Sequence, residues 1–243
     1  MISIIIPLYN ERENIQTYNT DLFPVIEQIS SEYDEIFEYV LVDDGSRDDT
    51  YALIQAIAAQ RGDVVAVTNG TNKGMGAAIK NGFSHARGDL FVTMDSDLTF
   101  RPEDIRKLLD AYRDGHPDCV SGSPYREKGL MEEVTFFRYV LSASVNTLYR
   151  VLLASDITCV SPIFRLYPKR AITGMNIRSN NFEINAEIIA KMLIAKRNVV
   201  EVPVKLYRRT HGESKIKIGK EIRNNIYLLG KIAKTKFLKV EWD

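Results

Sequence analysis

Residues 90–97 read Leu-Phe-Val-Thr-Met-Asp-Ser-Asp, an apolar run that passes directly into two acids. A short run of this kind predicts a buried strand with Asp95 and Asp97 at its carboxyl end. Two carboxylates one residue apart can reach a single divalent cation, and hard oxygen ligands suit Mg²⁺ or Mn²⁺. The alternative interpretation is a solvated loop or a helix cap, because Asp is common in both.

Three similar units precede this stretch. Their strands are expected at 2–6, 38–42 and 64–68, and their helices at 11–29, 48–60 and 74–86, with Asn10 as a cap for the first. Four strand–loop–helix units predict an α/β fold with a mostly parallel sheet flanked by helices. Ligands of such sheets bind beyond the carboxyl ends of the strands, so the loops there form the candidate site.

The pattern changes after Pro102. Helices are expected from 102 to 114, at 132–154 and at 182–196, and strands at 119–121, 163–167 and 199–207. Pro203 places the last strand near an edge of the sheet. Residues 210–215 are expected to form a mobile loop. From Ile218 to Ile232, apolar residues recur at helical spacing, which predicts an amphipathic C-terminal helix.

The composition of the 243 residues fits one large domain, with 45% apolar residues. Lys+Arg and Asp+Glu both total 32, so no global charge favours nucleic acid as a partner. From 205 onward, however, 11 Lys/Arg face four acids. The two cysteines, Cys119 and Cys159, have no metal-site spacing, and a reduced pair in the cytoplasm is expected. No stretch approaches the roughly 18 apolar residues of a membrane span.

Two further loops carry candidate binding residues. Asp43 and Asp44 follow the second strand, where a carboxylate can accept hydrogen bonds from ribose hydroxyls or a base edge. The alternative is a turn with Asp48 as a helix cap. Residues 72–76, Asn-Lys-Gly-Met-Gly, follow the third strand and could bring backbone N–H groups and Lys73 towards phosphate. The alternative there is a plain turn that opens a helix.

Together these motifs carry a family resemblance. They are Ser-Ile-Ile-Ile-Pro-Leu-Tyr-Asn-Glu-Arg-Glu-Asn-Ile (3–15), Val-Asp-Asp-Gly-Ser-Arg-Asp-Asp-Thr (42–50), Asn-Lys-Gly-Met-Gly-Ala-Ala (72–78) and Met-Asp-Ser-Asp-Leu (94–98). They resemble the inverting family 2 glycosyltransferases of GT-A (nucleotide-diphospho-sugar transferase) fold. Residues 182–187, 201–204 and 209–215 resemble, within that family, the dolichyl-phosphate mannose synthases and other polyprenyl-phosphate glycosyltransferases.

The motifs and the resemblance imply a nucleotide-sugar site, a metal site and a set of catalytic residues. The nucleotide-sugar residues would be Pro7, Tyr9, Asn10, Glu11, Asp43, Asp44, Lys73, Asp95, Ser96, Arg209 and Lys215. Asp95 and Asp97 would hold Mg²⁺ or Mn²⁺, and Asp97, Arg126 and Arg138 would serve catalysis. Residues 1–216 would form one catalytic domain, with a donor-nucleotide half (1–100) and an acceptor half and closing loop (101–216). A basic amphipathic helix (217–243) would follow.

Departures from the family pattern gather in the acceptor half. Thr99 stands where these synthases usually place Gln as a further metal ligand. Pro124 stands where they commonly have an acceptor-phosphate arginine, for which Arg126 could substitute. Residues 159–165 also depart, at Cys159 and Ile163. The donor, a GDP- or UDP-sugar, is therefore better supported than the acceptor.

The two kinds of acceptor, a hydroxyl and a phosphate, need different catalytic residues. A hydroxyl acceptor needs a general base, and Glu103-Asp104, the one candidate pair, is better explained as acids at a helix N-terminus. An acceptor phosphate needs no base but needs arginines, and Arg126, Arg138 and Arg165 favour a polyprenyl or dolichyl phosphate. A hydroxyl acceptor on a glycan or lipid and a non-catalytic nucleotide-sugar-binding protein stay open. A nucleotidyltransferase would carry a Gly-rich loop in place of residues 7–11.

The basic C-terminal helix leaves three interpretations open. It could lie on an anionic bilayer as a peripheral contact on the cytoplasmic face, where each Lys or Arg contributes on the order of 1 kcal/mol. It could pack on the domain, or it could bind a separate membrane subunit.

Overall fold

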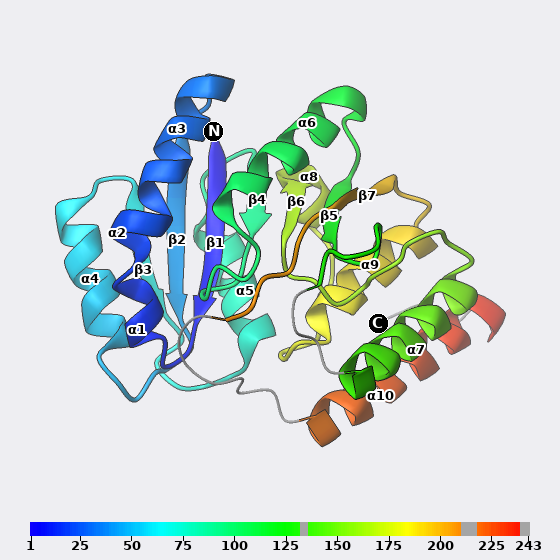
Figure 1. Cartoon of the computed structure of the whole chain (residues 1–243). Helices are drawn as coiled ribbons and strands as arrows, with labels where there is room; N and C mark the ends of the chain where they lie inside the picture. Colours follow the sequence, from blue (N-terminus) through cyan, green and yellow to red (C-terminus); the bar gives the residue numbers. More distant parts are fainter. Residues whose placement is uncertain (132–135, 210–217, 239–243) are drawn as a thin grey trace.

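A seven-stranded sheet in the order β3-β2-β1-β4-β6-β5-β7 forms the centre of the computed structural model (Figure 1). The structure describes residues 1–131, 136–209 and 218–238. The strands are β1 (Ile2–Leu8), β2 (Phe37–Asp43), β3 (Val64–Thr68), β4 (Leu90–Thr93), β5 (Cys119–Ser123), β6 (Arg165–Pro168) and β7 (Val199–Pro203). Neighbouring strands run parallel except at β6, which is antiparallel to both β4 and β5. The expected mostly parallel α/β sheet is confirmed.

The first strand shows why this sequence forms a central strand. Every residue of β1 is buried, and its side chains alternate between the two faces of the sheet. Ile2, Ile4 and Ile6 belong to one core, and Ile5 belongs to the other. A continuous apolar run is what a strand covered by helices on both faces requires.

Helices cover both faces of the sheet. They are α1 (Arg12–Ile15), α2 (Tyr18–Asp21), α3 (Phe23–Tyr33), α4 (Thr50–Gln60), α5 (Met75–His85), the 3₁₀ turn η1 (Pro102–Asp104), α6 (Ile105–Gly115), α7 (Phe136–Leu153), α8 (Lys169–Ile172), α9 (Ile184–Ile194) and α10 (Ile218–Leu238). The core with α2, α3, α4 and α6 fills one face, and the core with α5, α7, α8, α9 and α10 fills the other.

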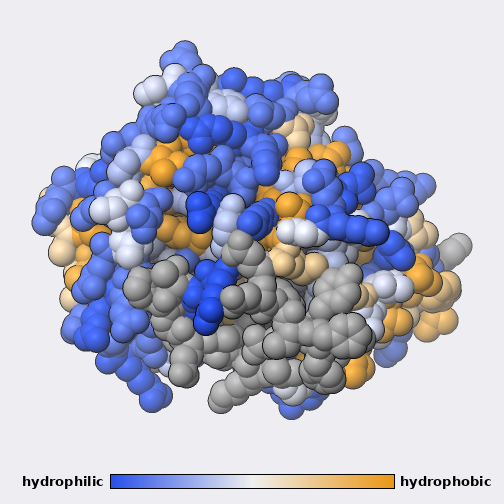
Figure 2. All heavy atoms as spheres, viewed as in Figure 1, coloured by the Kyte–Doolittle hydropathy of each residue, from blue (hydrophilic) through white to orange (hydrophobic). Residues whose placement is uncertain are grey.

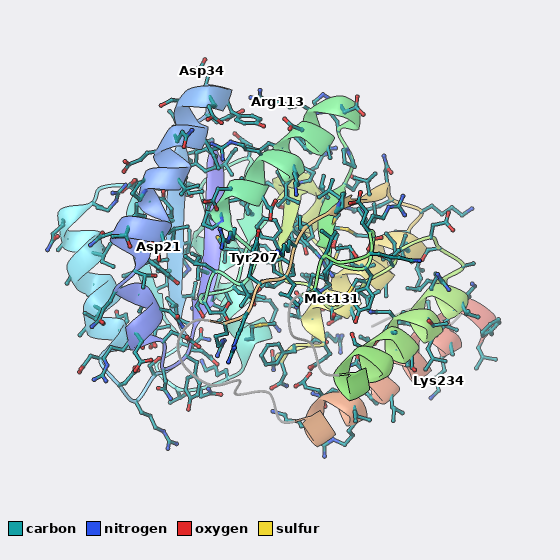
Figure 3. All side chains as sticks on the ribbon, in the orientation of Figure 1. Asp21, Asp34, Arg113, Met131, Tyr207 and Lys234 are labelled. Carbon is teal, nitrogen blue, oxygen red and sulfur yellow. The ribbon has the colours of Figure 1, made fainter. Side chains whose placement is uncertain are left out.

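Two expected elements differ from the structure. The single helix expected at 11–29 is wrong, because the chain forms three shorter helices there. Pro24 lies in the first turn of α3, where a residue without an N–H is tolerated at a helix start but not inside a helix. The strand expected at 199–207 ends at Pro203, and only an isolated bridge from Leu206 to Met131 continues beyond it. Figure 3 labels Met131 and Tyr207 on these two segments. The loop expected at 210–215 lies outside the described residues.

The C-terminal helix packs on the domain through one face. Leu228 and Ile232 of α10 are buried in the core that also contains Tyr149 of α7. The hydroxyl of Tyr149 donates to Oδ1 of Asn225 at 2.9 Å. Within the described chain, no helix combines the length and the apolarity that a bilayer crossing requires. Cys119 and Cys159 are free and buried.

Candidate active site

Asp95 and Asp97 leave the carboxyl end of β4 on a strained bend. Leu98 has a φ of 53°, a left-handed conformation that side chains other than glycine rarely adopt. Oδ1 of Asp97 accepts a hydrogen bond from the backbone N–H of Thr99 at 3.1 Å. Backbone strain of this kind persists where the surroundings hold it, and it is concentrated at functional sites.

Ser96, between the two acids, is held in place from α2. The hydroxyl of the fully buried Tyr18 donates to the backbone oxygen of Ser96 at 3.0 Å. Burial raises the pKa of this hydroxyl well above its ordinary value, and the charges of Glu11, Asp97 and Asp95 raise it further. Tyr18 therefore stays a neutral hydrogen-bond donor. Sequence reasoning missed it, because an aromatic residue in a helical stretch predicts core packing and nothing more.

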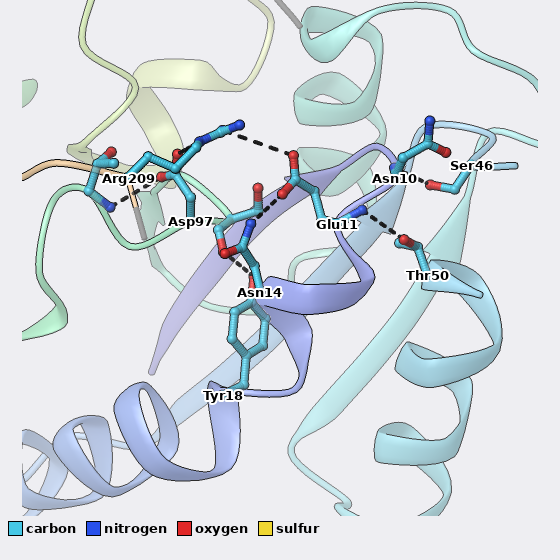
Figure 4. Close-up of polar contacts among 10 residues, drawn as sticks. Asn10, Glu11, Asn14, Tyr18, Ser46, Thr50, Asp97 and Arg209 are labelled. Carbon is cyan, nitrogen blue, oxygen red and sulfur yellow. Dashed lines mark hydrogen bonds and ion pairs between the residues drawn. The ribbon is translucent and has the colours of Figure 1, made fainter. Parts of the chain in front are cut away.

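The guanidinium of Arg209 lies against these carboxylates (Figure 4). Its Nε donates to Oδ2 of Asp97 at 2.5 Å, and its Nη2 lies 4.0 Å from Oε1 of Glu11. The backbone N–H of Tyr207 donates to the backbone oxygen of Thr99 at 2.9 Å, which brings this segment to the site. Burial lowers the pKa of Arg209, but the charge of Asp97 and the hydrogen bond to it outweigh burial, so the pKa is raised.

Asp95 is the carboxylate that lacks a compensating donor. Burial raises its pKa well above the ordinary value, the charge of Asp97 raises it further, and Arg209 opposes both effects. Among the described residues, none donates a hydrogen bond to this carboxylate. Among the described residues, the carboxylates of Glu11, Asp95 and Asp97 face a single arginine, so a divalent cation would offset the excess negative charge.

Asp95 and Asp97 can therefore hold a divalent metal only if other groups, such as substrate phosphates, supply the remaining ligands. Within the described residues, no group of three or more His, Cys, Asp or Glu side chains is placed to hold a metal ion. Mg²⁺ commonly binds through one or two carboxylates together with substrate phosphates, so two aspartates meet its protein requirement.

Asn10 and Glu11 tie the loop after β1 to the loop after β2. The backbone N–H of Asn10 donates to Oγ of Ser46 at 2.9 Å, and that of Glu11 donates to Oγ1 of Thr50 at 2.8 Å. Oδ1 of Asn10 accepts from the backbone N–H of Arg47 at 2.8 Å. The expectation that Asn10 caps a helix is therefore wrong, because its side chain bonds to the neighbouring loop.

Asp43 and Asp44 organise the loops around them. The carboxylate of Asp43 accepts hydrogen bonds from the backbone N–H groups of Gly45 and Ser46, at 3.1 and 3.0 Å, and from the hydroxyl of Thr68. The carboxylate of Asp44 accepts from three donors in the next loop, the side chain of Asn69 and the backbone of Lys73 and Gly74. These donors offset the repulsion between the neighbouring acids without a ligand. Direct contact of either acid with a nucleotide stays a prediction.

The loop at 72–76 is already hydrogen-bonded to the protein. The backbone N–H groups of Gly76 and Ala77 donate to the carbonyl of Asn180 at 2.8 and 3.2 Å. Those of Lys73 and Gly74 donate to Asp44. The N–H groups of Lys73, Gly74 and Gly76 are therefore engaged inside the protein, contrary to the expectation that they face phosphate. The side chain of Lys73 is exposed and stays a candidate for that role.

The remaining predicted residues fall into three groups. Pro7 forms part of β1, opposite Val42, and Tyr9 follows it half-buried. Arg126 is exposed in the loop after β5. Arg138 falls in α7, where its side chain lies outside the described part of the structure, and Lys215 lies outside the described residues altogether.

Arg165 does not take part in acceptor binding, contrary to expectation. Its side chain is fully buried. Its Nε donates to Oγ of Ser121 at 3.1 Å, and its two terminal nitrogens donate to the carbonyls of Asn185 and Val160 at 2.6 and 2.7 Å. These donors are engaged inside the core, so Arg165 joins β6 to its surroundings and cannot reach an external phosphate.

Comparison with known families settles the kind of protein. The family model described as glycosyl transferase family 2 matches residues 3–173. The chain belongs to this family. Its fold is similar to glucosyl-3-phosphoglycerate synthase from Mycobacterium tuberculosis solved with uridine diphosphate, with a TM-score of 0.68 and 21% identity over 96% of this chain and 80% of that one. The same enzyme solved with Mn²⁺, UDP-glucose and phosphoglyceric acid gives a TM-score of 0.67 and 19% identity, over 97% and 79% of the two chains. The expected GT-A fold is confirmed.

Two curated relatives of this family 2 chain are closer in sequence. It is 35% identical over 223 residues to a dolichol-phosphate mannosyltransferase of Pyrococcus furiosus, over 91% of this chain and 60% of the relative. It is 32% identical over 218 residues to an undecaprenyl-phosphate 4-deoxy-4-formamido-L-arabinose transferase of Edwardsiella ictaluri, over 88% and 62%. The chain thus spans about three-fifths of the length of these relatives.

Proposed function

We propose that this chain transfers a sugar from a GDP- or UDP-sugar to a polyprenyl or dolichyl phosphate, with inversion and with Mg²⁺ or Mn²⁺ as cofactor. The observation that carries this proposal is the meeting of Asp95, Asp97 and Arg209 at the carboxyl end of β4. Carboxylates for a metal and a guanidinium for a diphosphate are the groups that such a donor requires. The names of both curated relatives favour a lipid phosphate as acceptor.

In the proposed reaction, an oxygen of the acceptor phosphate attacks the anomeric carbon while the bond from that carbon to the nucleotide diphosphate breaks. Asp95 and Asp97 would hold the metal, which supplies positive charge to the departing diphosphate. Arg209 would bind the same diphosphate. Tyr18 holds Ser96, and therefore the bend that carries both acids, in position.

A phosphate acceptor is also supported by the surroundings of Glu103-Asp104. Asp104 ends η1, and its Oδ1 lies 2.8 Å from Nζ of Lys107. Acids in the first turn of a helix are explained by the helix dipole and this ion pair. A hydroxyl acceptor would need a general base, whereas a phosphate near neutral pH is already an anion and needs none, so this assignment of the pair favours a phosphate acceptor.

We further propose that α10 makes a peripheral contact with an anionic membrane. Ile226, Tyr227 and Phe237 of this helix are 64%, 66% and 69% exposed. Lys220, Arg223 and Lys234 are exposed on the same helix. Figure 2 shows apolar surface at the end of the molecule where Figure 1 places α7 and α10. A membrane-bound partner subunit is the competing occupant of this surface.

The test is a transfer assay with a panel of GDP- and UDP-sugars, Mn²⁺ and a polyprenyl phosphate. One donor should be turned over, chelation of the metal should stop the reaction, and Asp97→Ala should lower the rate by about 100-fold or more. Asp114→Ala, which removes an exposed acid at the end of α6, is the matched control and should keep the rate. Transfer that survives in Asp97→Ala, or a panel in which no donor reacts, would overturn the proposal.

A further inference from the structure

Asn14 is a buried amide whose side chain bonds to the carboxylate of Glu11. Its exposed fraction is 5%, and that of Glu11 is 7%. Nδ2 of Asn14 donates to Oε2 of Glu11 at 2.5 Å (Figure 4). A hydrogen bond to a carboxylate is stronger than one between neutral groups, and its loss is costly where both partners are buried. The position of the Glu11 carboxylate therefore depends on this amide.

The local backbone explains why the amide of Asn14 faces the side chain of Glu11. Glu11 is the N-cap of α1, and Asn14 is the third residue of that helix. In a common capping arrangement, the side chain at the third position bonds back to the backbone N–H of the N-cap. Here that N–H donates to Oγ1 of Thr50 at 2.8 Å. The amide of Asn14 is thus left to bond to the carboxylate.

The two oxygens of the Glu11 carboxylate face different partners. Oε2 accepts from Asn14, and Oε1 lies 4.0 Å from Nη2 of Arg209. The two oxygens move as one rigid group, so a rotation that breaks the first contact also changes the second. Asn14 therefore fixes the direction in which Glu11 presents its charge to the guanidinium.

Glu11 is the second carboxylate beside Arg209. Burial lowers the pKa of Arg209, whereas the charge of Asp97, the hydrogen bond to it and then the charge of Glu11 raise it. Asp97 is also a proposed metal ligand, so a bound metal would compete with Arg209 for it. Glu11 is outside the proposed metal ligands, and it can keep the guanidinium in the site while the metal occupies Asp97.

We propose that Asn14 is a positioning residue for donor binding. It directs Glu11 towards Arg209, and the guanidinium is thereby held where the donor diphosphate binds. This inference rests on the proposed function, in which Arg209 binds that diphosphate. An amide is required at position 14, because an apolar residue would leave Oε2 of Glu11 without this donor, and an ionised aspartate would repel the carboxylate.

The test measures by calorimetry how tightly GDP and UDP bind to the full chain with Mn²⁺, each variant being compared with the wild type at the same pH. Asn14→Leu should weaken binding about tenfold at every pH. Asn14→Asp should weaken it at least as much at pH ~8, where both carboxyl groups are ionised. At pH ~5.5 the two carboxyl groups share a proton, so that one can donate to the other, and the affinity should recover to within about threefold of the wild type.

A double variant tests whether Asn14 acts through Arg209. In an Arg209→Gln background, the effect of Asn14→Leu on nucleotide binding should largely disappear, because the group that Glu11 holds is absent. Additive losses would overturn the inference, since they would show that Asn14 acts on another part of the site.

The matched control is Asn19→Asp, which adds the same charge on the exposed side of α2 and should bind nucleotide as the wild type does at every pH. An equal pH dependence in Asn19→Asp and Asn14→Asp would overturn the inference, because the added charge alone would explain it. A loss in Asn14→Asp that is the same at every pH would overturn it as well. Circular dichroism at each pH separates loss of binding from loss of folding.

Failure of this inference and failure of the proposed function give different results. A wild type that binds neither nucleotide counts against the proposed function. Tight binding by the wild type together with an unaffected Asn14→Leu variant counts against Asn14 alone.

Discussion

Arg209 donates from Nε to Oδ2 of Asp97 at 2.5 Å, which joins the segment after β7 to the loop after β4. The same guanidinium lies 4.0 Å from Glu11. The guanidinium of Arg209 is thus hydrogen-bonded to Asp97, one of the two acids proposed as metal ligands. Metal binding and the hydrogen bond of Arg209 therefore compete for the same carboxylate.

Arg209→Gln is expected to change metal and nucleotide binding in opposite directions. Mn²⁺ should bind several-fold more tightly to the variant without nucleotide, because Asp97 is released. GDP or UDP should bind about tenfold more weakly in the presence of Mn²⁺, because a charge-assisted hydrogen bond to the diphosphate is lost. Electron paramagnetic resonance titration measures the first affinity, and calorimetry measures the second.

Arg208→Gln is the control, since it removes the neighbouring, exposed arginine. If both affinities fall together in Arg209→Gln, the guanidinium supports the metal site and does not compete with it.

Gly74→Ala is expected to disturb the part of the site that is proposed to bind the nucleotide-sugar donor. A Cβ at this position would lie 2.2 Å from the carbonyl oxygen of Asn180, and φ is 100°. Gly70→Ala is the control, because Gly70 also has a positive φ, 71°, while no atom lies within 4 Å of its Cβ. We expect Gly74→Ala to lose stability by about 2 kcal/mol more than Gly70→Ala and to raise the KM for the donor. Denaturant unfolding and steady-state kinetics measure the two effects, and equal effects in both variants would show that the contact with Asn180 is unimportant.

Glu221→Gln is expected to stabilise the protein at alkaline pH. The pKa of Glu221 is raised to about 7, mainly by burial and also by the charge of Glu183, while the charge of Lys220 opposes both effects. A carboxyl group with a raised pKa in the folded state favours folding below its unfolded pKa, and this contribution is lost as pH rises towards 7. The Tm of Glu221→Gln should therefore exceed that of the wild type at pH ~8 and approach it at pH ~4.

Glu13→Gln, which changes an exposed acid on α1, provides the comparison. A Tm difference for Glu221→Gln that does not change with pH would mean that Glu221 does not titrate in this range.

Ile226→Ser is expected to weaken binding to anionic vesicles. Ile226 is 64% exposed on α10, and burial of such a side chain in the lipid interface contributes about 1–2 kcal/mol, or roughly tenfold in partitioning. Ile36→Ser removes the same side chain from a site that is 71% exposed just before β2, at the opposite end of that strand from the active-site loops, and should leave binding unchanged. Vesicle co-sedimentation at two salt concentrations measures both. Equal binding of the two variants would favour a protein partner for α10.

Much of this architecture could be predicted from the local pattern of residues. Ile2–Leu8 and Leu90–Thr93 are short apolar runs between polar loops, and such runs become buried strands wherever both faces of a sheet are covered. Because parallel strands end at one edge, the chain order alone placed Asp44 and Asp95 on the same side of the sheet. Periodicity likewise indicated a helix at the C-terminus with one apolar face.

Other features depend on hydrogen-bond partners that are far apart in the sequence. Arg165 was expected to bind an acceptor, but carbonyls of Val160 and Asn185 enclose it. The N–H of Gly76 is expected from the sequence to face phosphate, but the carbonyl of Asn180, more than 100 residues away, accepts it.

Local hydrophobic patterning specifies which residues form the strands and which polar loops follow them, so both can be predicted from the chain. Which polar groups remain available to a ligand depends instead on contacts that form only when the chain folds. An arginine or an N–H group is free or engaged according to the acceptors that folding brings to it, and no local pattern records those acceptors. Asp97 and Arg209 illustrate this difference. Their charges can be read from the sequence, but their hydrogen bond forms only because folding brings the two side chains together.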